Sequence, residues 1–207
     1  MSNGRRSLNK FFTANQFIGS FKDVKNIPTF NNLLECCFVG RSNVGKSSII
    51  NAITKNNRLA KTSKTPGRTQ SINLFSISDR LIFADLPGYG FANFPETLKK
   101  KLYYLIRNYI EKRIFLKNVF LLIDGKVGIK ESDQETITYF IQKNISFALI
   151  LTKIDKCTKN LLNNNKKEII NLLNQNSSNY SNIFFTSSFK NKVISDIQKN
   201  IYNLTKE

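Results

Sequence analysis

The sequence predicts an α/β fold: a six-stranded, mostly parallel sheet with one antiparallel strand and helices on both faces, giving three layers. Short apolar runs alternate with helical stretches, a pattern typical of a parallel sheet covered by helices. Only Ser78-Asp79-Arg80 separates the second predicted strand from the third, far less than a parallel crossover needs, so these two form an antiparallel hairpin. The predicted strands are 33–39, 71–77, 81–85, 118–124, 147–152 and 183–186.

Helices are expected between these strands, where apolar residues recur at helical spacing. Asn- and Ser-rich stretches at 163–165 and 174–182 indicate helix ends or loops. With 207 residues and no repeat or linker, we expect one domain over 31–207, preceded by an N-terminal extension over 1–30. The predicted helices follow Gly45 and cover 95–115, 131–143, 159–173 and 194–204.

Charge is the strongest compositional signal. The chain carries 32 basic and 14 acidic residues, a formal charge of +18, which favours a nucleic-acid partner over a membrane surface. The alternative is that AT-rich coding inflates lysine and the excess only keeps the protein in solution. Histidine is absent, which excludes a Ser-His-Asp triad, a histidine general base and a histidine-containing zinc site.

The remaining composition indicates a cytoplasmic protein. Cys36, Cys37 and Cys157 form neither a CxxC pair nor an even disulfide set, so reduced thiols are expected. No run approaches the roughly 18 apolar residues of a membrane helix, and residues 1–12 lack the apolar stretch of a signal peptide. The basic N-terminus keeps an organellar transit peptide as the alternative.

A phosphate-binding loop follows the first predicted strand and precedes a helix-like run. It has the P-loop form GxxxxGKS, in which backbone N–H groups and the helix N-terminus surround phosphates. Lys46 is expected to reach the β- and γ-phosphates, and Ser47 to ligate Mg²⁺. The alternative is a glycine-rich turn with an incidental lysine. The expected phosphate-binding residues are Gly40, Arg41, Ser42, Asn43, Val44, Gly45, Lys46 and Ser47.

Two further segments supply groups for a metal and for the γ-phosphate. The third strand ends in Asp85-Leu86-Pro87-Gly88, where Asp85 can hold Mg²⁺ through water and the Gly88 amide can sense the γ-phosphate. An ordinary Pro-Gly turn is the alternative. The polar loop 61–70 offers hydroxyls, of which Thr69 is favoured and Thr65 comes second. The predicted metal ligands are Ser47, Thr69 and Asp85, and the predicted catalytic residues are Lys46, Thr69 and Gly88.

The base of the nucleotide is expected to be read by Thr152-Lys153-Ile154-Asp155, which has the form TKxD. The Asp155 carboxylate can accept hydrogen bonds from guanine N1–H and the N2 amino group, whereas adenine offers no such donors, so GTP and GDP are expected rather than ATP. Lys153 is expected to pack along the nucleotide. After the last strand, Thr186-Ser187-Ser188 fits a loop whose backbone contacts guanine O6, although a plain turn explains it equally well.

The order GRSNVGKSS, PGRTQ, DLPGYG, TKID and TSS resembles the EngB (YihA/YsxC) family of bacterial ribosome-biogenesis GTP-binding proteins, over about residues 30–204. The resemblance implies a three-layer P-loop GTPase domain of the TRAFAC class that assists late assembly of the large ribosomal subunit, and whose loss disturbs cell division and septation. It also places five more residues at the nucleotide site. They are Gly67, Arg68, Thr69, Gln70 and Ser71.

The sequence departs from its relatives at the loop expected to contact guanine and at the position expected to orient water. Family members commonly have glycines after the Ser187-Ser188 pair, where this chain has Phe189 and Lys190. Ras-like GTPases place a water-orienting glutamine after the DxxG glycine, but Tyr89 stands here, so slow hydrolysis stimulated by the pre-ribosome is expected. Asn43 occupies a position that helps to hold K⁺ in related GTPases.

Other functions fit parts of the sequence. A GTPase acting on another RNA, such as a tRNA-modification factor, would be expected to carry an added domain, and Asp155 argues against an ATPase or nucleotide kinase. Tyr89 leaves a non-hydrolysing GTP-bound scaffold open. A monomer is expected. The basic residues 99–101, Arg107, Lys112, Arg113 and Lys117 predict an rRNA surface, with a solvated helix face as the alternative.

Overall fold

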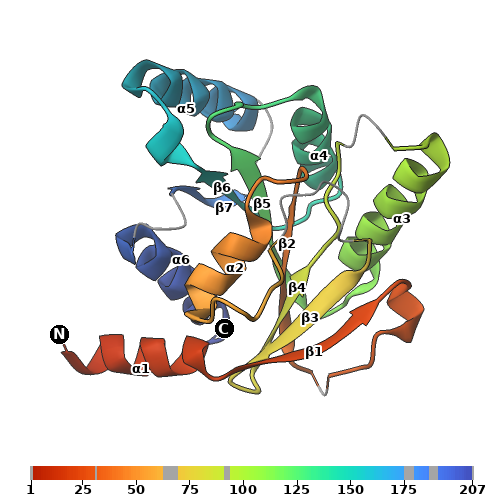
Figure 1. Cartoon of the computed structure of the whole chain (residues 1–207), viewed down its shortest axis with the longest axis vertical. Coiled ribbons are helices and arrows are strands. Elements are labelled where there is room, and N and C mark those ends of the chain that lie inside the picture. Colours follow the sequence, from red (N-terminus) through yellow and green to blue (C-terminus); the bar gives the residue numbers. More distant parts are fainter. Residues whose placement is uncertain are drawn as a thin grey trace.

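A single twisted sheet runs through the molecule (Figure 1). The computed structural model describes residues 2–30, 32–62, 70–90, 94–174, 180–186 and 191–206. Within these residues the sheet has seven strands in the order β1-β3-β4-β2-β5-β6-β7. The strands are β1 (Asn15–Phe21), β2 (Leu34–Gly40), β3 (Ile72–Ile77), β4 (Leu81–Asp85), β5 (Leu116–Asp124), β6 (Phe147–Thr152) and β7 (Tyr180–Phe185).

The direction of the strands confirms the α/β prediction and its hairpin. Strands β4, β2, β5, β6 and β7 are parallel to one another, whereas β3 is antiparallel to β4. The predicted strand count of six is wrong, because β1 adds a seventh strand antiparallel to β3. Its residues are half-polar, contain Gly19 and include no buried side chain, so this edge strand lacks the apolar run that marks the others.

Helices cover both faces of the sheet, as predicted. Helices α1, α2 and α6 share one apolar cluster with the sheet, and α3, α4 and α5 share the other. The structure corrects one detail: residues 163–165 lie inside α5, where buried Asn165 donates from Nδ2 to the Gly125 carbonyl at 2.7 Å. The helices are α1 (Ser2–Thr13), α2 (Lys46–Thr54), α3 (Glu96–Lys112), α4 (Glu131–Gln142), α5 (Lys159–Asn174) and α6 (Asn191–Leu204).

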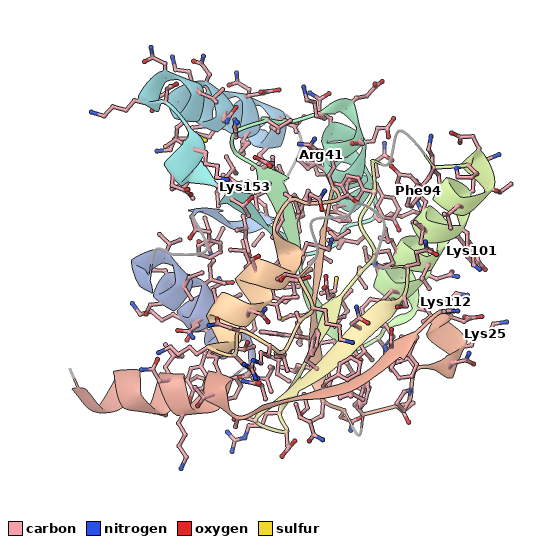
Figure 2. All side chains as sticks on the ribbon, in the orientation of Figure 1. Lys25, Arg41, Phe94, Lys101, Lys112 and Lys153 are labelled. Carbon is pink, nitrogen blue, oxygen red and sulfur yellow. The ribbon has the colours of Figure 1, made fainter. Side chains whose placement is uncertain are left out.

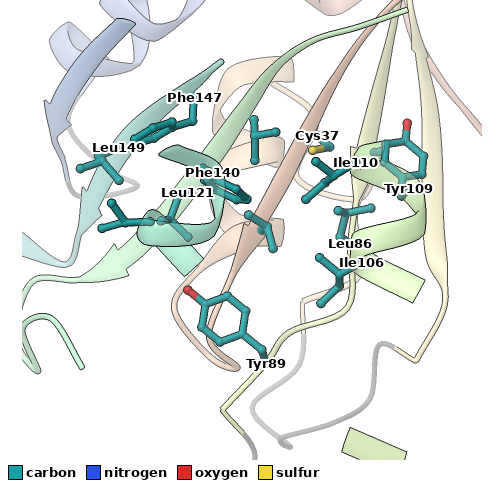
Figure 3. Close-up of a cluster of buried hydrophobic side chains, with 14 of the residues drawn as sticks. Cys37, Leu86, Tyr89, Ile106, Tyr109, Ile110, Leu121, Phe140, Phe147 and Leu149 are labelled. Carbon is teal, nitrogen blue, oxygen red and sulfur yellow. The ribbon is translucent and has the colours of Figure 1, made fainter. Parts of the chain in front are cut away.

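The apolar core follows from the alternation of side chains along the central strands. In β2, Cys36 and Phe38 face α2 and α6, whereas Cys37 and Val39 face α3 and α4. Figure 3 shows the second cluster, in which Phe140 of α4 packs over the sheet. All three cysteines are free thiols, and burial raises the pKa of Cys36 to about 12, so the strand cysteines act as small core residues.

The first helix is part of this core, although nothing in its sequence predicted it. Phe12 of α1 is fully buried, and the Phe11 ring meets the Tyr202 ring of α6 edge-on at a centroid distance of 5.1 Å. The boundary at residue 30 stays a prediction, but residues 8–21 contribute to the same sheet and core as the rest of the chain. In the described part of the chain, no helix combines the length and apolarity needed to cross a membrane.

Replacing Phe12 by alanine is therefore expected to lower the free energy of unfolding by about 3–5 kcal/mol, since a buried ring is lost and a cavity remains. Phe17→Ala on the edge strand is the control, because Phe17 is 50% exposed and should change stability little. Urea denaturation measures both. Equal stability of the two variants would show that α1 is dispensable for the core.

Candidate functional site

The predicted phosphate loop lies between the end of β2 at Gly40 and the start of α2 at Lys46. Both glycines are required by geometry. A Cβ on Gly40 would lie 2.5 Å from the Leu122 carbonyl oxygen, and Gly45 has φ of 104°, in the left-handed region. The strand, loop and helix context that the P-loop pattern needs is thus present, with the amino end of α2 directed at the loop.

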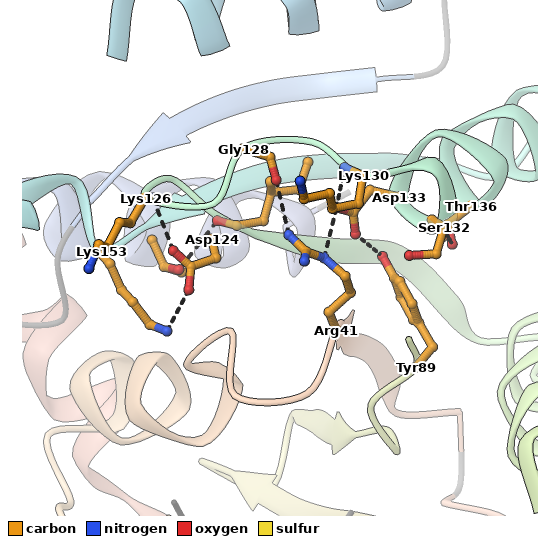
Figure 4. Close-up of polar contacts among 12 residues, drawn as sticks. Arg41, Tyr89, Asp124, Lys126, Gly128, Lys130, Ser132, Asp133, Thr136 and Lys153 are labelled. Atoms are coloured by element: carbon orange, nitrogen blue, oxygen red, sulfur yellow. Dashed lines mark hydrogen bonds and ion pairs between the residues drawn. The ribbon is translucent and has the colours of Figure 1, made fainter. Parts of the chain in front are cut away.

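The base-reading segment is tied directly to this loop. The Lys153 ammonium donates to the Asn43 carbonyl at 2.7 Å. It also pairs with Asp124 Oδ2 at 2.6 Å, the contact drawn in Figure 4. The buried Thr152 hydroxyl donates to the Val44 carbonyl at 2.7 Å, which is a structural reason for threonine at this position. Sequence reasoning predicted Thr152 and Lys153 as nucleotide contacts but missed their bonds to the loop, and it missed Asp124.

The remaining members of the segment lie just beyond β6. Ile154 and Asp155 begin the short 3₁₀ helix Ile154–Lys156, and the Asp155 side chain is exposed, as a residue that reads a ligand must be. Thr186 is buried, and its N–H donates to the Leu151 carbonyl at 2.8 Å. The predicted backbone contact to guanine O6 therefore cannot come from the Thr186 amide while this bond is intact; Ser187 and Ser188 lie outside the described residues.

A hydroxyl and a buried carboxylate, both predicted metal ligands, meet at the start of α2. The Ser47 hydroxyl donates to Asp85 Oδ2 at 3.0 Å, and Asp85 is only 2% exposed. Its other oxygen, Oδ1, is buried with no partner among the described residues. Burial raises the pKa of Asp85 and lowers the pKa of Lys46, and the attraction between the two opposes both shifts. A buried carboxylate oxygen without a donor, beside a hydroxyl, suits Mg²⁺.

The DxxG segment lies against the phosphate loop. Tyr89 N–H donates to the Gly40 carbonyl at 3.3 Å, and Ser42 N–H donates to the Tyr89 carbonyl at 3.1 Å. A Cβ on Gly88 would come within 2.8 Å of Ser42 Oγ, so only glycine fits here. Leu86 and Pro87 are buried behind it. The structure thus brings Asp85 to Gly88 together with the loop, as predicted.

The Arg41 side chain does not point into the phosphate loop, so the predicted contact of this residue with phosphates falls to its backbone. Its Nε pairs with Asp133 Oδ2 at 2.9 Å and its NH2 group donates to the Gly128 carbonyl at 3.0 Å (Figure 4). The Tyr89 hydroxyl donates to Asp133 Oδ1 at 2.8 Å, and the Lys130 N–H donates to Oδ2. Only the backbone of Arg41 is left to contact phosphates.

Asp133 is the residue at this centre that sequence reasoning missed. It is fully buried at the third position of α4, where burial raises the pKa of its carboxyl and the Tyr89 hydroxyl and Arg41 guanidinium oppose the rise. An acidic residue in the first turn of a helix is common on the surface, so only its position three residues into α4 hinted at a cap.

Several predicted residues remain outside this geometry. Gly67, Arg68 and Thr69 lie outside the described residues. Of their neighbours, Gln70 is exposed, and the Ser71 hydroxyl shares a 2.6 Å hydrogen bond with that of Ser20 on β1. The bond to Ser20 therefore places Ser71 beside the edge strand β1.

Asp133→Asn should lower the free energy of unfolding by roughly 3 kcal/mol, because the Arg41 guanidinium would lose its charged partner while staying largely buried. Glu131→Gln is the matched control: it lies exposed in the same helical turn and should cost less than about 1 kcal/mol. Thermal and urea unfolding of both variants measure this. Similar values for the two would mean that the buried network does not stabilise the site.

Known proteins resemble this chain in sequence. Residues 35–153 match the family described as 50S ribosome-binding GTPase. The chain is 47% identical over 156 residues to a probable GTP-binding protein EngB of Rickettsia bellii, covering 74% of this chain and 73% of that protein. It is 43% identical over 192 residues to the Rickettsia akari protein of the same description, covering 90% and 87%.

Two solved structures share the fold. A probable GTP-binding protein engB has a TM-score of 0.64 at 23% identity, covering 83% of this chain and 98% of that one. Era in complex with MgGDPNP and nucleotides 1506–1542 of 16S ribosomal RNA has a TM-score of 0.63 at 21% identity, covering 81% and 56%. The family match and the sequence relatives together show that the chain belongs to the EngB family of GTP-binding proteins and is a P-loop GTPase.

Proposed function

We propose that this GTPase is a GTP-dependent switch that assists assembly of the large ribosomal subunit in the cytoplasm, and that normal cell division and septation depend on it. The observation that supports this proposal is a pair of hydrogen bonds, in which Lys153 and Thr152 of the base-reading segment donate to carbonyls of the phosphate loop. Support for the ribosomal partner comes from the family description, from the resemblance to EngB and from the charge of +18.

The nucleotide is held at its two ends. The backbone N–H groups of 40–47 bind the phosphates and Lys46 neutralises their charge, while Asp155 accepts the two donors on the Watson–Crick edge of guanine. Gly67 to Ser71, Ser187 and Ser188 complete the proposed contacts, whereas the Thr186 amide is bonded to the Leu151 carbonyl and is not among them.

Ser47 and Asp85 would hold Mg²⁺, with Thr69 as the third proposed ligand; the orphaned Asp85 oxygen is the observation that supports this. When bound, Mg²⁺ supplies positive charge next to the β- and γ-phosphate oxygens. This chain's own contribution is to orient: Lys46 and the Gly88 amide would face the γ-phosphate as it is cleaved from GTP to give GDP and phosphate. The Era neighbour, which holds MgGDPNP, adds support by fold alone.

We propose slow intrinsic hydrolysis. The Tyr89 ring is 3% exposed and its hydroxyl is engaged by Asp133, so the side chain after the DxxG glycine is not available to orient water. The ribosomal partner would supply or order the missing group.

We further propose that K⁺ assists the reaction near Asn43, at the exposed tip of the loop, where an amide oxygen is a suitable ligand. Equal rates of GTP hydrolysis in K⁺ and Na⁺ salts would contradict the K⁺ proposal.

The proposed ribosomal surface lies along α3. Lys101 and Lys112 are exposed there (Figure 2), and Lys25 follows on the short 3₁₀ helix Val24–Asn26, which packs against α3. Arg113 does not belong to this surface, which corrects the prediction: its guanidinium bonds the buried carboxylate of Glu35. The other exposed basic residues of the proposed surface are Lys100 and Arg107 on α3 and Lys117 on β5.

Guanine recognition is tested by Asp155→Asn. The amide would turn one acceptor into a donor facing the donors of the base, so GDP affinity should fall roughly a hundredfold or more. Glu168→Gln, an exposed carboxylate on α5, is the control and should bind GDP normally. Displacement of a fluorescent GDP analogue gives both values; an unchanged affinity in Asp155→Asn would show that another residue reads the base.

The ribosomal partner is tested by co-sedimentation with bacterial large-subunit particles in GTP, in GDP and without nucleotide. Association is expected to be strongest with GTP, and Lys101→Glu with Lys112→Glu should weaken it, whereas Lys159→Glu with Lys167→Glu on α5 should not. No association in any nucleotide state would count against the ribosomal proposal. Equal loss in both charge-reversed proteins would place the contact elsewhere.

A further inference from the structure

A second cavity lies away from the nucleotide site, at the corner where β1 pairs with β3. Its volume is about 410 Å³, within the roughly 300–1,000 Å³ range of small-molecule sites. The walls come from β1, from the start of β3 and from the segment 58–61 that follows α2. Apart from Ser71, none of these residues is among the proposed nucleotide contacts. The edge strand β1 lies beside β3 in Figure 1.

One wall of the cavity is aromatic. Phe17 is 50% exposed, and its ring lies 5.7 Å from that of the buried Phe75, with an angle of 52° between the ring planes. Phe75 fixes the inner side of the Phe17 ring and leaves the rest of it in contact with water. Such an exposed ring offers a stacking surface for a planar ligand, and any nucleobase satisfies that requirement.

The other wall is basic. Arg58 and Lys61 line the cavity and are exposed, and neither forms an ion pair with a described residue. Among the described residues that line the cavity there is no carboxylate. The two cations are thus placed to meet a negatively charged group beside the aromatic ring, and phosphate is the anion that accompanies a base in a nucleotide.

Between these walls lies a small polar group. The Ser20 hydroxyl shares a 2.6 Å hydrogen bond with that of Ser71 and reaches Asn73 Oδ1 at 2.8 Å. Hydroxyl and amide groups can both donate and accept, so this group can bond the edge of a base or a ribose 2′-hydroxyl. The cavity therefore combines stacking, hydrogen bonding and positive charge within one site.

We propose that this cavity binds an unpaired nucleotide of RNA, with the base against Phe17 and the phosphates beside Arg58 and Lys61. It rests on the proposed function only in naming RNA as the partner, and it adds a site that is separate from the basic surface along α3. A peptide strand added to the free edge of β1 would not use the two cations, so charge and aromatic wall together favour RNA.

The test uses the full chain and two fluorescein-labelled probes of equal length, a single-stranded oligouridylate and an RNA duplex, with anisotropy as the readout. Phe17→Ala should weaken single-strand binding roughly tenfold and leave duplex binding unchanged, because only an unpaired base can stack in the cavity. Phe17→Trp should restore binding. Ile170→Ala is the matched control, since Ile170 is 46% exposed on α5 and should behave as wild type.

A second measurement locates the contact without a substitution. Oligouridylate carrying 5-iodouridine should photo-crosslink to the peptide that contains Phe17, and Arg58→Glu with Lys61→Glu should reduce the yield more than Lys159→Glu with Lys167→Glu. Crosslinks confined to other peptides would overturn the proposal. The proposal would also be overturned if Phe17→Ala bound the single strand as wild type does, or if it weakened binding of the single strand and the duplex equally.

These probes contain neither ribosomal particles nor guanine nucleotide, so the two proposals fail separately. If Phe17→Ala left single-strand binding unchanged while co-sedimentation with large subunits was normal, only the cavity proposal would be overturned. Binding of single strands at Phe17 without any association with large subunits would support the cavity and contradict the ribosomal function.

Discussion

The position of Lys153 is the constraint on which the nucleotide site depends. Its ammonium group lies between the Asn43 carbonyl of the phosphate loop and the Asp124 carboxylate at the end of β5, at 2.7 and 2.6 Å. Charge-assisted bonds of this length, in a partly buried pair, hold geometry more firmly than neutral ones. With the Thr152 hydroxyl on Val44, they fix the loop for the phosphates against the segment for the base. The phosphate loop and the predicted base-reading segment are therefore held at a fixed spacing in the structure without a nucleotide.

A second set of contacts, centred on the Asp133 carboxylate, holds the other side of the phosphate loop. Arg41 reaches away from the loop to Asp133 at the start of α4, and Tyr89 meets the same carboxylate from the DxxG segment. The phosphate loop, the DxxG segment and α4 thus share one buried charge. Movement of Tyr89 on GTP binding would have to break or carry along this contact. Tyr89 therefore serves as a structural link at the position where other GTPases keep a catalytic glutamine.

Sequence patterns predicted the parts of the fold that repeat and missed those that depend on distant contacts. Buried strands and amphipathic helices carry local periodicity, and the three-residue connection 78–80 alone required the hairpin. Edge strand β1 has no such signal, because only one of its edges is paired and its side chains are half-polar.

The same distinction holds at the site. The P-loop motif predicted where the backbone lies, but the direction of the Arg41 side chain depends on Asp133, 92 positions later in the chain. Asp124 pairs with Lys153 for the same reason, through strand order and not through sequence proximity. Cys36 and Cys37 show the reverse: burial on two faces of one strand explains them without any chemistry.

The most direct test is calorimetric titration of the wild-type chain with GTP, GDP and ATP in magnesium buffer. If one preformed site grips phosphates and reads guanine, both guanine nucleotides will bind with measurable heat, and ATP will bind several powers of ten more weakly or not at all. Equal affinity for ATP, or no heat with any of the three, would contradict the account.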